Sequence, residues 1–220
     1  AQKTNNDENA EKRNVGSFHG IDVGTGIRLV LTHGGTEDVV VSASSTEFRD
    51  RIVTEVKNGI LKIHYDNKLG AINRRRETKD LKAYVSYKTL EQLYVTTGAG
   101  VKIEGVLESA SLDLKANTGA LVNGEVNIDR LKVDQNTGSK ITLTGKAGYL
   151  EISGDTGSKF MGEDMQTSIC NVSVSTGAKV AVRADKELQV RASTGGVVTY
   201  KGDASVKDVK TNTGGSGSKI

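Results

Sequence analysis

Side chains that commonly carry out catalysis or bind metals are few and widely scattered in this chain. The three histidines, His19, His33 and His64, lack the spacing of zinc ligands, and we expect each on the surface or on a strand. The 220 residues contain no nucleophile elbow, no phosphate-binding loop and no dinucleotide-binding fingerprint. The single cysteine, Cys170, excludes an internal disulfide and a cysteine zinc cluster. The sequence therefore predicts no catalytic residue, no metal ligand and no cofactor.

Two groups of charged residues remain as candidates for a site. Asp155, Glu163 and Asp164 could line one face, as carboxylates do in β-helical polysaccharide lyases, if the fold brings them together. The densest basic run, NRRRETK at residues 73–79, is interpreted as a solvated loop, with contact to an anionic ligand as the alternative. Neither group has a motif that fixes its chemistry, so the ligand-binding residues stay unassigned.

Charge and composition bear on three questions: whether the chain binds nucleic acid, whether it crosses a membrane, and which fold class it has. Thirty Lys and Arg residues against 27 Asp and Glu residues give a net charge of +3, with the two signs interspersed. This balance does not favour a nucleic acid as a partner. No apolar run reaches the roughly 18 to 20 residues of a transmembrane helix. With 26 glycines, no proline and 4% aromatic residues, the composition favours a regular β array.

The dipeptide Thr-Gly recurs at intervals of 18 to 21 residues, which is the signature of stacked repeats. Its glycines are Gly98, Gly119, Gly138, Gly157, Gly177, Gly195 and Gly214. Small polar residues precede each Thr, and only Ala, Ser or Gly follows each Gly. Because glycine accepts backbone angles that other residues reach with strain, each Thr-Gly pair suits a tight corner.

Counted from each corner glycine, apolar residues stand an odd number of positions away and polar residues an even number. Five positions before each glycine the residues are Leu93, Leu114, Val133, Ile152, Val172, Val190 and Val209. Such alternation predicts half-buried strands, so each repeat reads as strand, corner, strand. Cys170 shares the apolar parity and is interpreted as a buried, inert thiol. We therefore predict an all-β fold, a single-stranded parallel β-helix (β-solenoid) of about seven 19-residue coils over residues 91–220.

The first part of the chain is also β in character but lacks the repeat. Residues 15–90 are expected to form an N-terminal β region, either a cap on the first coil or a small sandwich. Asn58-Gly59 lies between two β runs and predicts a two-residue hairpin turn, and STEFRDR at residues 45–51 fits one helical turn. The polar residues 1–14 are interpreted as a flexible leader, which suggests export although no signal peptide is visible.

Three stretches of the chain form a recognisable pattern: FHGIDVGTGIRLVLTHGGTEDVVVSA, the VTEVKNGILKIHY hairpin, and the Thr-Gly repeats that end in STGGVVTYKGDASVKDVKTNTGGSG. With these stretches, residues 15–220 resemble the head-GIN-domain family of putative auto-transporter adhesins, envelope proteins of the Bacteroidetes type. The corners differ from the Ser-Gly type usual in the family, and the usual proline near DLKAYVSY is missing. The resemblance implies a β-solenoid exported to the periplasm, outer membrane or cell surface, and it supplies no catalytic residues.

Three functional hypotheses follow. The first is a non-enzymatic envelope protein whose long β faces bind a glycan, a lipid or a protein, with peripheral or lipid-anchored membrane association but no transmembrane span. The second is a structural protein whose coils assemble end to end, against which the Gly- and Ser-rich last repeat argues. The third is a carbohydrate-active enzyme on the same scaffold, because a fold does not fix a function.

Overall fold

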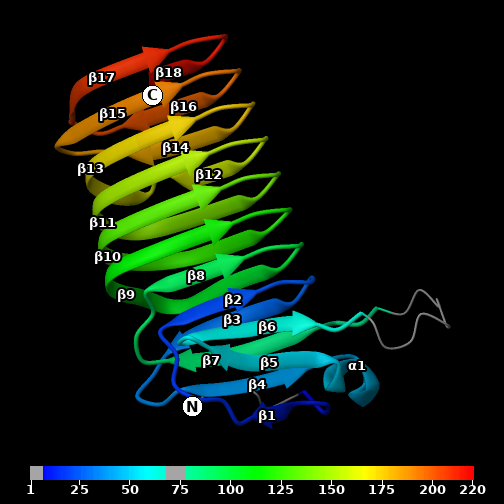
Figure 1. Cartoon of the computed structure of the whole chain (residues 1–220). Helices are drawn as coiled ribbons and strands as arrows, with labels where there is room; N and C mark the ends of the chain where they lie inside the picture. The colour runs from blue at the N-terminus through cyan, green and yellow to red at the C-terminus, as the bar shows by residue number, and fades with distance from the viewer. Residues whose placement is uncertain (1–6, 68–77) are drawn as a thin grey trace.

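Successive coils stack into one elongated β-solenoid of about seven turns (Figure 1). The structure is a computed structural model and describes residues 7–67 and 78–220. Strand β1 and strand β18 lie at opposite ends of the stack, and the Thr-Gly corners follow one another along one edge (Figure 1). The predicted all-β parallel solenoid is therefore confirmed.

Each coil contributes one strand to each of two sheets. Strands that run into the corners form sheet I, and strands that leave the corners form sheet II. Sheet I contains, in spatial order, β5 (Ile52–Lys57), β6 (Ile60–Tyr65), β2 (Gly20–Val23), β8 (Gln92–Val95), the second halves of β9 (Gly100–Ala116), β10 (Leu121–Gln135) and β11 (Lys140–Gly154), then β13 (Met165–Val174), β15 (Glu187–Ala192) and β17 (Ser205–Thr211). Sheet II contains β1 (Glu11–Arg13), β4 (Asp38–Ser42), β7 (Lys82–Tyr87), β3 (Arg28–His33), the first halves of β9, β10 and β11, then β12 (Lys159–Gly162), β14 (Lys179–Arg183), β16 (Val197–Lys201) and β18 (Ser216–Lys219).

Both residues of every Thr-Gly corner adopt the left-handed backbone conformation. At Thr137 and Gly138, for example, φ is 47° and 68°. This is expected for glycine but strained for threonine, whose Cβ is branched. The glycine N–H of each coil donates to the threonine carbonyl of the next, as from Gly138 to Thr156 at 3.0 Å. The corners are thus joined by a ladder of backbone hydrogen bonds along the stack.

The predicted apolar column fills the space between the two sheets. Leu114, Val133 and Ile152 stand in direct register on adjacent strands, and none is more than 1% exposed. Burying each such aliphatic side chain is worth roughly 1.5 to 3 kcal/mol before entropy is counted. Val209 in the last coil is 37% exposed, because no further coil lies over it. The column is therefore confirmed, and its burial ends with the stack.

The inner side of the corners also holds polar side chains. Gln135, Ser139 and Ser158 are at most 3% exposed. Among the described residues, no hydrogen-bond partner lies within reach of the Gln135 amide or of the two serine hydroxyls. A buried polar group without a partner typically costs 1 to 3 kcal/mol, about as much as one coil gains from an aliphatic side chain. The corners are therefore a part of the interior where polar groups meet the apolar column.

The N-terminal segment is inserted into the stack. Strand β2 pairs in parallel with β6 on one side and with β8 on the other, and β3 likewise lies between β7 and β9. Thr25-Gly26 forms the corner between β2 and β3, with φ values of 60° and 71°. Residues 15–90 thus contribute parallel coils to the same two sheets, and antiparallel strands β4 and β5 follow at the end.

Three local expectations for this region can be compared with the structure. β5 and β6 form an antiparallel hairpin around Asn58 and Gly59, both with positive φ, so the predicted two-residue turn is confirmed. The predicted helical turn is α1 (Thr46–Asp50), and the side chain of Ser45 caps it. Residues 1–14 were expected to form a flexible leader, but Glu11–Arg13 form strand β1, which pairs antiparallel with β4. This strand forms because the edge of β4 offers backbone groups that are otherwise unpaired.

Candidate binding surfaces

The three histidines occupy separate places in the fold. His19 packs over the hairpin turn at Gly59, and the ring of His33 lies 5.6 Å from that of Tyr87. His64 is exposed on β6. Over residues 7–67 and 78–220, no group of three His, Cys, Asp or Glu residues is arranged to hold a metal ion. These side chains therefore do not form a common site.

Cys170 lies inside the solenoid, in register with Leu150 and Leu188 on the neighbouring strands. The residue has no measurable exposure, and burial raises the pKa of its thiol to about 12. A thiol that stays protonated is a poor nucleophile. The predicted burial of Cys170 is confirmed, and its lack of reactivity stays a prediction.

The three candidate carboxylates lie on two different edges of the solenoid. Asp155 precedes a Thr-Gly corner and accepts hydrogen bonds from the Thr156 N–H at 2.6 Å and the Ser175 hydroxyl at 2.9 Å. Hydrogen bonds from the neighbouring hydroxyls and from that N–H hold the pKa of Asp155 below its ordinary value. Glu163 and Asp164 form the turn between β12 and β13, at the bend opposite the corners. The fold therefore does not bring these carboxylates together.

Most of the basic run at residues 73–79 cannot be placed, because residues 73–77 lie outside the described part of the chain. Lys79 lies with its ammonium nitrogen 4.3 Å from the centre of the Tyr65 ring. Arg51 approaches the same ring at 4.9 Å. Two cations thus stack on one tyrosine beside the corner edge, an arrangement that favours cation–π contact.

A shallow groove of about 530 Å³ crosses the outer face of sheet II. Its floor contains Gly98 and Gly100, which have no side chains to fill the space, and Leu121 at one side is 47% exposed. Arg28, Lys82 and Lys102 stand at its rim, and each forms an ion pair with a carboxylate. The groove therefore combines an apolar floor with neutralised cations at its edge.

Beyond Leu121, the same position of sheet II is occupied by three lysines in successive coils. Lys140 is in register with Lys159, and Lys159 with Lys179. All three are exposed. We call these residues the lysine column. Each lysine lies two residues after the corner glycine of its coil. The three side chains therefore project from the same face, on strands whose backbones are about 4.8 Å apart.

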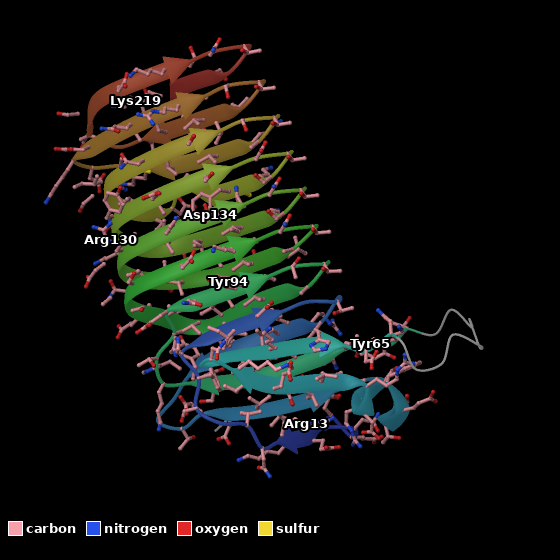
Figure 2. All side chains as sticks on the ribbon, viewed as in Figure 1. Arg13, Tyr65, Tyr94, Arg130, Asp134 and Lys219 are labelled. Atoms are coloured by element: carbon pink, nitrogen blue, oxygen red, sulfur yellow. The ribbon has the colours of Figure 1, made fainter. Side chains whose placement is uncertain are left out.

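A second hollow of about 330 Å³ lies on the outer face of sheet I. Ser153 and Ser173 form its floor, and larger side chains surround them: Glu151, Asn171, Gln189 and Arg191. Asn171 donates to the Tyr149 hydroxyl at 2.8 Å, and Arg130 covers that ring at 4.7 Å. Figure 2 labels Tyr94, Arg130 and Asp134 on this sheet. Its surface is polar, with amide, hydroxyl and charged groups pointing to solvent.

Comparison with known proteins identifies the family. Residues 17–204 match the family described as putative auto-transporter adhesin, head GIN domain. The chain belongs to this family. A search of curated proteins finds no match. Within the described residues, no helix has the length and apolar character that a membrane span requires.

Solved structures of three bacterial proteins have the same fold as the chain. A putative adhesin from Bacteroides fragilis NCTC 9343 gives a TM-score of 0.84 at 18% identity, covering 96% of this chain and 95% of that one. A putative adhesin from Parabacteroides merdae ATCC 43184 gives 0.75 at 14% identity, covering 96% and 95%. A putative lipid binding protein from Parabacteroides distasonis ATCC 8503 gives 0.71 at 16% identity, covering 96% of each chain.

Sequence reasoning missed both hollows and the lysine column. The column could have been found, since Lys140, Lys159 and Lys179 share one offset from their corner glycines. The groove on sheet II could not, because it depends on Arg28 lying between Lys82 and Gly100, and no sequence repeat connects these three residues.

Proposed function

We propose that this head GIN protein is a non-catalytic binding protein of the cell envelope, exported to the periplasm, outer membrane or cell surface. In this proposal it holds an extended partner along the outer faces of its two sheets. The observation that carries the proposal is the parallel register of the coils, which places equivalent exposed residues side by side on successive strands along the stack. Straight, repetitive faces suit long partners better than small substrates.

The chemistry of the two faces supports a glycan, a lipid or an envelope protein as the partner class. The hollow on sheet I, around Ser153 and Ser173, offers hydroxyl, amide and charged groups that suit a hydroxylated ligand. The groove on sheet II, over Gly100 and beside Leu121, has an apolar floor that suits a hydrocarbon segment. One structural neighbour is named a putative lipid binding protein and two are named putative adhesins, which agrees with either kind of ligand.

The test is a binding screen with the whole chain, using a glycan array and vesicles of bacterial membrane lipids. Binding in either format supports the proposal, and two blank screens contradict a glycan or a lipid as the partner. Light scattering on the same sample separates binding from self-assembly, because end-to-end growth would give large, concentration-dependent particles.

An assay for turnover tests the non-catalytic part of the proposal. The chain is incubated with uronic-acid polysaccharides, and formation of new chain ends is measured. Turnover above that of a control without protein would show a carbohydrate-active enzyme instead, whichever residues carry it.

A further inference from the structure

The lysine column places like charges directly beside one another on sheet II. Lys140, Lys159 and Lys179 occupy equivalent positions on three adjacent parallel strands. Over two strand spacings the column extends about 10 Å along the stack. Like charges directly opposite each other on neighbouring strands destabilise a sheet. The fold therefore carries two unfavourable pairs of like charges, Lys140 beside Lys159 and Lys159 beside Lys179.

Elsewhere the chain neutralises lysines with a carboxylate two residues away, where side chains share a face. On sheet I such ion pairs join Lys57 with Glu55 at 3.0 Å, Lys115 with Asp113 at 3.4 Å, Lys132 with Asp134 at 4.0 Å, and Lys210 with Asp208 at 2.9 Å. On sheet II, Lys102 pairs with Glu104 in the same way at 3.2 Å. Local neutralisation by an acidic residue is thus frequent for lysines on these faces.

The lysine column departs from that pattern. Two residues after its members stand Thr142, Met161 and Ala181, and two residues before them stand the corner glycines. Among the described residues, no carboxylate oxygen lies within 4.0 Å of any of the three ammonium groups. The column is therefore a line of exposed positive charge that the chain itself leaves uncompensated.

The surroundings of the column favour a thin anionic chain over a flat anionic surface. Its immediate neighbours on the sheet are uncharged. Glu125 is exposed farther towards the bend on sheet II, so a bilayer of anionic lipids laid on this face would meet like charge there. A single polymer chain that follows the lysines avoids this carboxylate.

We propose that the lysine column binds a linear acidic polysaccharide, of the uronic-acid type, laid along the axis of the solenoid. This inference rests on the proposed binding function and names the chemistry of the partner for sheet II. Each lysine ammonium pairs with one carboxylate of the polymer, and the repeated spacing of the coils meets the repeated charge of the chain. Because the three ammonium groups repel one another in the free protein, an incoming line of negative charge relieves a strain already present.

The experiment measures binding of the whole chain to polygalacturonate by calorimetry at low and at moderate salt. We expect the affinity to fall with salt, with a slope of log K against log salt of about −2 for three contacts. The variant Lys140→Gln/Lys159→Gln/Lys179→Gln should lose about fivefold per lysine, on the order of 100-fold in all. Fully methyl-esterified polygalacturonate, which keeps the sugar chain without its charges, should not bind.

The matched control is Lys115→Gln/Lys132→Gln/Lys210→Gln, which removes the same charge from sheet I. These lysines are paired with aspartates, so we expect its affinity for polygalacturonate to stay within about twofold of the unmodified chain. Equal losses in both variants would show that net charge, and not the column, attracts the polymer, and would overturn the proposal. Thermal unfolding confirms that both variants fold, and the column variant should not melt earlier, since repulsion is removed.

Other outcomes also decide the question. Binding of the methyl ester as strongly as the acid would overturn the proposal, because recognition would then not depend on charge. Binding to phosphatidylglycerol vesicles but not to polygalacturonate would assign the column to a membrane surface instead. If the screens above find a neutral glycan or a lipid while polygalacturonate fails, the binding function stands and this inference is wrong.

Discussion

Replacing Thr137 by asparagine should stabilise the solenoid. Thr137 has φ of 47°, in the left-handed region where a residue with a branched Cβ is strained. The left-handed conformation costs a residue with a Cβ roughly 1 to 2 kcal/mol, and asparagine tolerates it best after glycine. Thr137 is exposed, so the substitution removes no buried contact. We therefore expect Thr137→Asn to raise the free energy of unfolding by about 1 kcal/mol, or Tm by roughly 2 to 4 °C.

The hairpin at Asn58-Gly59 provides the reverse experiment. Asn58 has φ of 54° in a turn of the same kind, and it is also exposed. Asn58→Thr should lower the free energy of unfolding by about the amount that Thr137→Asn raises it. Both changes are measured by urea and thermal unfolding, followed by circular dichroism. If Thr137→Asn destabilised the chain while Asn58→Thr also did so, contacts between stacked threonines would outweigh the backbone strain, and our reasoning would be refuted.

Four further outcomes can be checked with the same methods. Ile152→Asp buries an unpaired charge in the apolar column and should cost more than about 4 kcal/mol, so that an unchanged melting curve would contradict its inward position. Gln135→Leu replaces a buried amide that lacks a described partner and should raise stability by about 1 to 2 kcal/mol, whereas a loss would reveal a hydrogen bond. The pKa of Asp155 is lowered in the folded state, so its ionised carboxylate stabilises the fold above the ordinary pKa, and this stabilisation is lost as pH falls through the folded pKa. The Tm of Asp155→Asn should therefore fall less steeply below about pH 4 than the Tm of the unmodified chain. The Cys170 thiol should react with a thiol reagent only on unfolding, and rapid reaction of the native chain would contradict its burial.

The sequence predicted the features that depend on local pattern. Alternation around Leu114, Val133 and Ile152 indicated which side chains face inward, because strand parity needs only neighbours in the chain. The Thr-Gly spacing indicated the coils, and Asn58-Gly59 indicated the hairpin. Each of these signals lies within about twenty residues, and each corresponds to a feature of the structure.

Features that depend on distant segments were beyond the same reasoning. The place of β2 between β6 and β8 brings together residues 20, 60 and 92, and no periodicity connects them. The groove beside Leu121 could not be predicted for the same reason, because part of its rim comes from β3 and β7. The unpaired lysines needed no distant contact, only a comparison of one offset across coils and a search for the carboxylates that would balance them.

The inserted position of β2 and β3 has a consequence for how the chain is made. Each later coil can settle on its predecessor as soon as it emerges, since its partner already exists. The first coil cannot, because its two neighbours, β6–β7 and β8–β9, are synthesised afterwards. Roughly the first hundred residues must therefore be synthesised before the first coil can fold, and later coils can then add one turn at a time.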